Sequence, residues 1–134
     1  MDYVKIDGIA YDVVVTGITE DFNILNSENA GRSAGVGSRM VLDPLGTFYG
    51  HTVTFKRKQG HEAIYDQLFY NLSLPRTDGL PVEIVHGQTT IAYDAYVSTG
   101  SRALERINVN TGKVYWREFS VKFTPMEAQV TPYE

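Results

Sequence analysis

Alternation of apolar and polar residues predicts that most of this chain forms β-strands. Every second residue in the segment 9–15 is large and apolar, a pattern typical of a strand with one buried face. Asp7 and Gly8 precede this segment and favour the positive φ angles of a two-residue type I′ turn. We therefore predict an N-terminal hairpin with arms at 3–6 and 9–15.

The second half of the chain predicts two more hairpins. Segments 81–86 and 89–98 flank a Gly-Gln turn, and segments 103–109 and 113–123 flank an Asn-Thr-Gly turn. Alternation along the last strand places three residues in the core: Phe119, Val121 and Phe123.

The segment 47–58 is also predicted to be a strand, but its register stays open. One possible inward set is Tyr49, His51, Val53 and Phe55. The other is Phe48, Thr52 and Thr54, and periodicity does not choose between them.

Residues 61–72 leave the strand pattern and predict the one helix. Apolar residues recur there at helical spacing, namely Ile64, Leu68, Phe69 and Leu72, with Tyr65 beside them. Acidic residues lie in the first half of this segment, and Pro75 follows its end.

These elements predict one mainly β domain over residues 1–124. Its expected form is a β-sandwich or open barrel of about seven to eight antiparallel strands with one flanking α-helix. The remaining segment, 125–134, has no pattern and is predicted to be an extended C-terminal arm.

The segment 26–40, NSENAGRSAGVGSRM, interrupts this pattern with Gly, Ser and Asn. Ordering so long a loop costs backbone entropy, and it has little apolar surface to bury in return. We therefore expect a second molecule to order it. The residues expected at that interface are Asn26, Glu28, Arg32, Ser33, Ser38, Arg39 and Met40.

Composition supports the β prediction and narrows the range of partners. Val, Ile and Thr total 34 residues against 16 for Leu and Ala. The 134 residues include no cysteine, which excludes disulfides and thiolate sites and fits a reducing compartment. The N-terminus has no signal-peptide pattern and no run is long enough to span a bilayer, so we expect a soluble protein. A net charge of −4 disfavours specific nucleic-acid binding.

No motif predicts covalent chemistry strongly. The segment 31–35 matches the G-x-S-x-G pattern with Ser33 as nucleophile, but it lies in a polar loop without the strand and helix that a nucleophile elbow needs. His51, His61 and His86 lack metal-ligand spacing and are interpreted as satisfied or solvated histidines. The scattered carboxylates are interpreted as solvated faces. We assign no catalytic residue, no metal and no cofactor.

Two surface features have alternative interpretations. Lys56, Arg57 and Lys58 could face an anionic partner, but such a run more often keeps a strand end in water. Trp116 and the nine tyrosines could stack on sugars, although core or interface positions are more usual for them.

The order of short motifs resembles small structural proteins from the tails of phages and prophages of Gram-positive bacteria. The motifs are I-D-G-x-x-Y-D-V (6–13), a polar loop containing arginine, G-x-x-V-x-F (50–55), Y-D-Q-L (65–68), a strand ending in V-H (85–86), A-Y-V-S (95–98) and Y-W-x-x-x-S-V-x-F (115–123). The resemblance is to the tail-tube and distal-tail fold, and it covers most of the chain. The second domain of larger distal-tail proteins has no counterpart here.

The resemblance implies a non-enzymatic virion protein, assembled in the cytoplasm of the host bacterium. It implies a ring-forming homo-oligomer, a hexamer or a trimer, that contacts other phage tail proteins, with DNA passing through the lumen and no membrane partner. In that fold a long loop between early strands packs on the next subunit, which corresponds here to 26–40. Two other hypotheses remain: a carbohydrate-binding module that uses Trp116, and a small hydrolase that uses Ser33.

Overall fold

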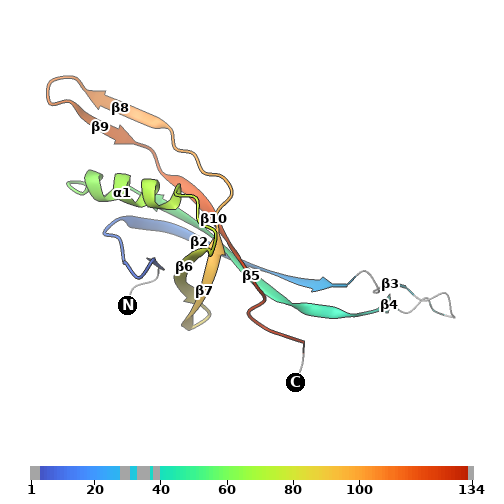
Figure 1. Cartoon of the computed structure of the whole chain (residues 1–134). Coiled ribbons are helices and arrows are strands. Elements are labelled where there is room, and N and C mark those ends of the chain that lie inside the picture. Colours follow the sequence, from blue (N-terminus) through green and yellow to red (C-terminus); the bar gives the residue numbers. More distant parts are fainter. Residues whose placement is uncertain (1–3, 28–30, 33–36, 38–39, 133–134) are drawn as a thin grey trace.

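The computed structural model describes residues 4–27, 31–32, 37 and 40–132 (Figure 1). This part of the chain consists mainly of strands and contains one helix. Eight of the strands have three or more residues. The elements are β1 (Val4–Ile6), β2 (Val14–Asn26), β3 (Gly31–Arg32), β4 (Met40–Val41), β5 (Pro44–Lys56), α1 (Glu62–Leu72), β6 (Leu80–His86), β7 (Thr89–Tyr96), β8 (Leu104–Asn108), β9 (Lys113–Trp116) and β10 (Phe119–Pro125). The prediction of a mainly β fold with antiparallel strands and one helix is confirmed.

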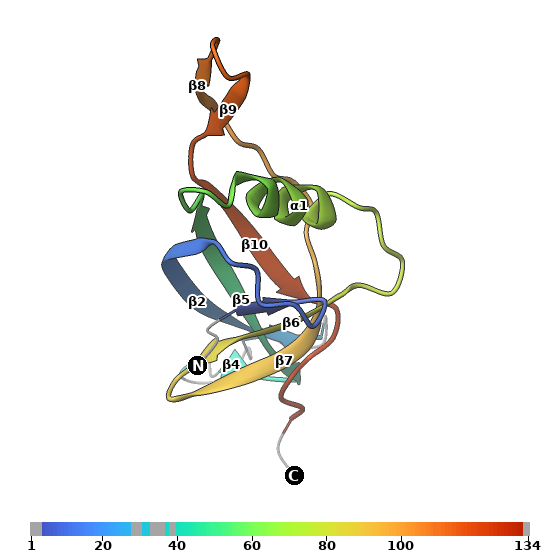
Figure 2. The same cartoon turned by 90° about the vertical axis from the view of Figure 1, so that its left-hand side faces the viewer.

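The main sheet has six strands in the order β1-β6-β7-β10-β5-β2. Strand β10 joins its two halves, because Phe119 to Phe123 pair with β5 whereas Thr124 and Pro125 pair with β7. The two halves face each other, and in Figure 2 β6 and β7 cross the direction of β5 and β10. The architecture is of the β-sandwich or open-barrel type.

The core lies between these halves and beneath α1. Its buried side chains include Val82 and Ile84 from β6, Phe123 from β10, and Leu68 from α1. Burying a side chain of this size stabilises the fold by roughly 1.5–3 kcal/mol. The helix closes the core because Tyr65, Leu68 and Leu72 are all buried, so its predicted extent is confirmed. Its buried face is turned toward Tyr65, and Ile64 is only partly buried.

The tertiary structure also chooses the register of β5. His51, Val53 and Phe55 are buried, and the intervening threonines lie on the opposite face. The alternation predicted for Phe119, Val121 and Phe123 is confirmed, since each is at most 4% exposed.

The predicted N-terminal hairpin is only partly correct. Asp7 and Gly8 adopt the positive φ angles expected of the turn, 56° and 78°, and an isolated bridge joins Ile6 to Ile9. However, β1 pairs with β6, and the next strand begins only at Val14 and pairs with β5. Because Val4 and Ile6 become buried against β6, the sheet edge outcompetes the local hairpin.

The last predicted strand, 113–123, is in fact two strands. Strand β9 pairs with β8 in a separate two-stranded sheet, and β10 begins at Phe119. The other hairpin predicted in this half, β6–β7, is confirmed with its turn at Gly87 and Gln88.

The segment 125–134, predicted to be an extended C-terminal arm, packs on the body at several of its described residues. Thr47 and Val130 form a bridge, with Thr47 N donating to Val130 O at 2.8 Å. Gly46 makes this approach possible, since a Cβ atom there would lie 2.6 Å from the Ala128 Cβ. The tail therefore packs back on β5 through specific backbone bonds that composition does not reveal.

The one helix among the described residues, α1, is not long and apolar enough to cross a bilayer.

Candidate functional site: an apolar hairpin arm and the histidine cluster at its base

The β2–β5 hairpin extends well beyond the body of the protein (Figure 1). Strand β10 pairs with β5 only from Phe55 to His51, whereas the β2–β5 ladder continues to Asn26 and Pro44. We call residues 21–26 and 44–50 the arm. Over this length β2 is the ladder partner of β5, and the tail adds the Thr47–Val130 bridge and the bonds from Gln129 to Thr47 and Tyr49.

The inner face of the arm is apolar and continues the core into solvent. Because side chains alternate along β2, Ile18, Glu20, Phe22 and Ile24 point to one side, so this face is interrupted at Glu20 and is apolar again at Phe22 and Ile24. Ile18 packs against the core, but Phe22 is 66% exposed and Ile24 is 51% exposed. The face that is buried at the base of the arm is therefore uncovered at its end.

The outer edge of β2 is also free. Strand β2 is the last strand of the main sheet, and no other described strand pairs with its far side. Its ladder to β5 runs without a register shift from Gly17 to Leu25. A long, regular and partly apolar edge of this kind is a template for pairing with another strand.

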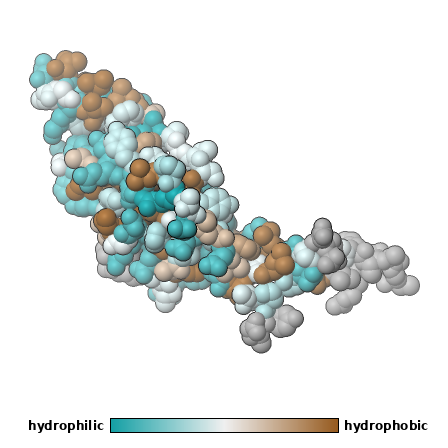
Figure 3. All heavy atoms as spheres, viewed as in Figure 1, coloured by the Kyte–Doolittle hydropathy of each residue, from teal (hydrophilic) through white to brown (hydrophobic). Residues whose placement is uncertain are grey.

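A second exposed hairpin, β8–β9, projects from the opposite end of the molecule. Its exposed apolar residues are Leu104, Ile107, Val109 and Val114. Figure 3 shows apolar residues on both projections, that is, on the arm and on the β8–β9 hairpin, with a largely polar surface between them on this face.

The predicted interface loop is only partly described. Glu28, Ser33, Ser38 and Arg39 lie outside the described residues, as does most of the G-x-S-x-G segment, so their roles stay predictions. Asn26 lies opposite Pro44 at the end of β2. Arg32 and Met40 pair across β3 and β4, and Met40 is 40% exposed.

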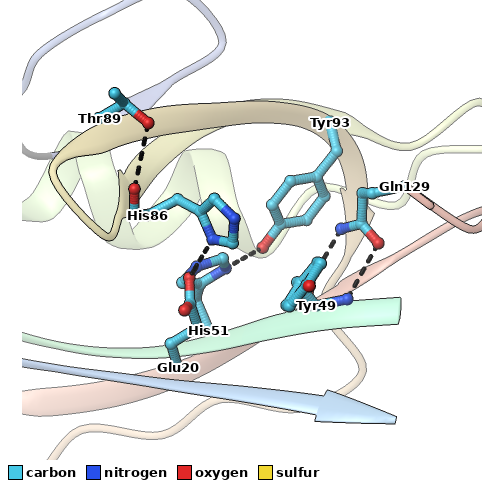
Figure 4. A network of polar contacts seen from close by, with 7 residues as sticks. All are labelled: Glu20, Tyr49, His51, His86, Thr89, Tyr93 and Gln129. Atoms are coloured by element: carbon cyan, nitrogen blue, oxygen red, sulfur yellow. Dashed lines mark hydrogen bonds and ion pairs between the residues drawn. The ribbon is translucent and has the colours of Figure 1, made fainter. Parts of the chain in front are cut away.

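A polar cluster lies at the base of the arm, where the β2–β5 hairpin leaves the body (Figure 4). Glu20 and His51 are direct cross-strand partners, and His51 Nε2 lies 2.8 Å from Glu20 Oε2. His86, at the end of β6, places its Nδ1 2.7 Å from the same oxygen. The hydroxyl of Tyr93 on β7 lies 2.7 Å from His51 Nδ1. One carboxylate oxygen thus joins two imidazoles from different halves of the sheet.

Packing holds this cluster in place. His51 is fully buried, and Tyr49 packs edge-on against the His86 ring with 4.8 Å between the ring centroids. Gln129 from the tail fixes Tyr49, because its side chain accepts from Tyr49 N at 2.9 Å and donates to Tyr49 O at 3.0 Å.

Electrostatics favour a carboxylate at this point. Partial burial of Glu20 opposes ionisation, but hydrogen bonds from His86 and then His51 outweigh it and lower the pKa of Glu20. Burial raises the pKa of Tyr93 far above its usual range, so its hydroxyl stays protonated.

The sequence did not predict this constellation. The interpretation of satisfied histidines holds for His51, both of whose ring nitrogens are bonded, but the spacing gave no sign that His51 and His86 share Glu20. The one sequence signal was that His51 alternates in step with Val53 and Phe55, which places its imidazole on the same buried face of β5. The third histidine, His61, lies apart and pairs with Asp12 at 2.6 Å.

The other surface candidates are engaged within the chain. Arg57 forms an ion pair with Glu105, and Lys58 forms one with Asp12 at 2.9 Å. The Trp116 ring is only partly exposed and has the Arg102 guanidinium 4.2 Å from its centroid. This contact occupies ring surface that a sugar would need.

No protein-family model matches this chain, and no curated protein matches it at a significant level of similarity.

Proposed function

We propose that this protein is a non-enzymatic structural component of a phage tail, located in the tube, the tail tip or the terminator ring. It acts by binding copies of itself and neighbouring tail proteins. The observation that carries this proposal is the arm, which exposes Phe22 and Ile24 on its inner face and has an outer edge that pairs with no other described strand.

A surface of this kind is costly in a monomer. Exposed Phe22 and Ile24 leave apolar area in water, and the free edge of β2 invites uncontrolled strand pairing. In a closed ring the same groups become contacts between subunits. The free energy of assembly then offsets the cost of displaying them.

The placement of the two projections favours contacts between copies of this chain. The arm and the β8–β9 hairpin leave the body in different directions, so one surface of a subunit can meet a different surface of the next (Figure 1). Such a head-to-tail contact generates a ring when the rotation between subunits closes.

Charge and motif order support the same function. A net charge of −4 suits a conduit for DNA, since a strongly cationic lumen would retain phosphate. The motif order that resembles tail-tube and distal-tail proteins is compatible with the observed β-sandwich or open barrel and its single helix.

Self-association is tested by sedimentation velocity and mass photometry over a wide range of protein concentrations, followed by electron microscopy of the assembled fraction. We expect the wild type to form larger species as concentration rises. The double variant Phe22→Ser/Ile24→Ser should remain smaller, because it removes the apolar face without touching the core. Deletion of residues 31–38 tests the loop in the same assay.

The matched control is Leu74→Ser, which removes an apolar side chain that is 56% exposed and lies outside both projections. It should associate as the wild type does. A wild type that stays monomeric at all concentrations, alone and with co-expressed proteins encoded by neighbouring genes, would contradict the proposal.

A further inference from the structure

We propose that Glu20, His51 and His86 form a binding site for a first-row transition metal ion, with Zn²⁺ as the best match. One ligand atom from each residue lies within 4.8 Å of the others. The cluster lies on the same face of the β2–β5 hairpin as Phe22 but closer to the body, and all three ligands come from one chain, so metal binding does not need the proposed assembly.

The ligand types favour such an ion over Mg²⁺ or Ca²⁺. Two imidazole nitrogens and one carboxylate oxygen match the borderline character of Zn²⁺, whereas Mg²⁺ and Ca²⁺ prefer sets of oxygen ligands. Three protein ligands leave a fourth tetrahedral position for water or another group. His86 and Glu20 have side chains 33% and 34% exposed, so an ion can approach from solvent.

The two nitrogen to oxygen distances fit an ion after a small adjustment, and the two ligand nitrogens lie within 4.8 Å of each other. Both nitrogen to oxygen separations, 2.7 and 2.8 Å, are those of hydrogen bonds in the metal-free state. In a tetrahedral zinc site the same separations are about 3.3 Å, given Zn–N and Zn–O bonds of about 2.0–2.1 Å. Expansion by about half an ångström is within reach, because Glu20 and His86 are partly exposed and only His51 is held rigidly.

Tyr93 allows the buried imidazole of His51 to keep a hydrogen bond at Nδ1 both without and with a metal ion. Without metal, the Glu20 carboxylate can only accept, so His51 Nε2–H donates to it, and in the neutral imidazole Nδ1 accepts from the Tyr93 hydroxyl. With metal, His51 Nε2 supplies its lone pair to the ion and Nδ1–H donates to the Tyr93 oxygen. A hydroxyl both donates and accepts, so His51 keeps every partner when the tautomer changes. A protein group that bonds the second nitrogen of a ligating histidine is a recurrent feature of metal sites.

The test uses the full chain without an affinity tag, freed of metal by a chelator and titrated with Zn²⁺ by calorimetry. Co²⁺ titration, followed by visible absorption, reports the coordination. We expect one equivalent to bind, the bands of a four-coordinate Co²⁺ site to appear, and the melting temperature to rise with Zn²⁺ concentration.

Three variants locate the site. Glu20→Gln and His86→Ala should each weaken Zn²⁺ binding at least tenfold, and Tyr93→Phe should weaken it by about 10–100-fold through misorientation of His51. Glu20 and His86 are partly exposed, so both of their variants should fold, which circular dichroism checks. The control is His61→Ala, which removes a histidine outside the cluster and should bind Zn²⁺ as the wild type does.

Absence of stoichiometric Zn²⁺ binding by the wild type would overturn the proposal. Equal affinity in the wild type, Glu20→Gln and His86→Ala would do the same, since any bound ion would then lie elsewhere.

Discussion

Arg102 joins α1 to β9, and its replacement tests how the β8–β9 hairpin is anchored to the body. The side chain is 5% exposed, and its Nη1 donates to Asp66 Oδ1 at 2.7 Å. Its Cζ lies 4.4 Å from the ring centroid of Phe69 and 4.2 Å from that of Trp116. One guanidinium therefore contacts a carboxylate and aromatic rings from two elements.

The expected loss follows from these contacts. An ion pair to a partly exposed carboxylate contributes about 0.2–1 kcal/mol. Each cation–π contact away from water contributes about 1–2 kcal/mol. With one ion pair and two such contacts, Arg102→Ala should therefore lower the free energy of unfolding by about 2–5 kcal/mol. Arg102→Lys should cost less, about 1–2 kcal/mol, because a compact ammonium keeps the charge but cannot cover the rings as a planar guanidinium does.

Urea unfolding measures both losses. Trp116 is the only tryptophan in the chain, so its fluorescence reports directly on the contact that is removed. The matched control is Arg106→Ala, in which an exposed arginine loses a contact to a single ring, that of Tyr115, at 4.4 Å. That variant should lose about 0.5 kcal/mol. The reasoning is refuted if Arg102→Ala costs no more than Arg106→Ala.

Two further predictions concern the core and the tail. Burial raises the pKa of Tyr65 to about 12 against nearby Arg102, and its hydroxyl donates to Arg117 O at 2.6 Å. The folded pKa lies above the unfolded value of 10.0, so this stabilisation is complete below pH 10 and is lost between pH 10 and 12. Tyr65→Phe should be less stable than the wild type by about 1 kcal/mol at pH 8. When urea unfolding is repeated at pH 11, the variant should lose less stability than the wild type, because it has no phenol to ionise at this position. Gly46→Val should release the tail, because the new Cβ would lie 2.6 Å from the Ala128 Cβ, and hydrogen exchange at the Thr47 amide should accelerate at least tenfold.

Each of these two has a control. The control for the first is Tyr70→Phe, which removes the hydroxyl of a tyrosine that is 60% exposed; between pH 8 and pH 11, Tyr65→Phe should lose less stability than this variant does. Gly17→Ala adds a methyl group where nothing lies within 4 Å, and should leave the exchange of the Thr47 amide unchanged. Parallel losses in Tyr65→Phe and the wild type at high pH would count against the first prediction. Unaltered exchange in Gly46→Val would count against the second.

Features set by neighbouring residues were predictable from the sequence. The helical spacing around Leu68 identified α1, because the side chains that share a helix face are close in the chain. The Gly87 turn identified the β6–β7 hairpin, and alternation identified Phe119 and Phe123 as core residues. Local periodicity and turn chemistry determine such elements before any long-range contact forms.

Features that depend on contacts between distant segments could be known only from the tertiary structure. The partner of β1, the docking of Val130 on Thr47, and the meeting of His51 with His86 all join segments that are distant in the chain. The first arises because burial of Val4 and Ile6 against β6 prevails over the nearest pairing, and the other two depend on hydrogen bonds between distant segments. Periodicity along the chain does not encode which distant segments meet. The sequence alone therefore determined the helix, the β6–β7 hairpin and the inward face of β10, while the packing of the two half-sheets determined the register of β5, the polar cluster and the projection of the arm.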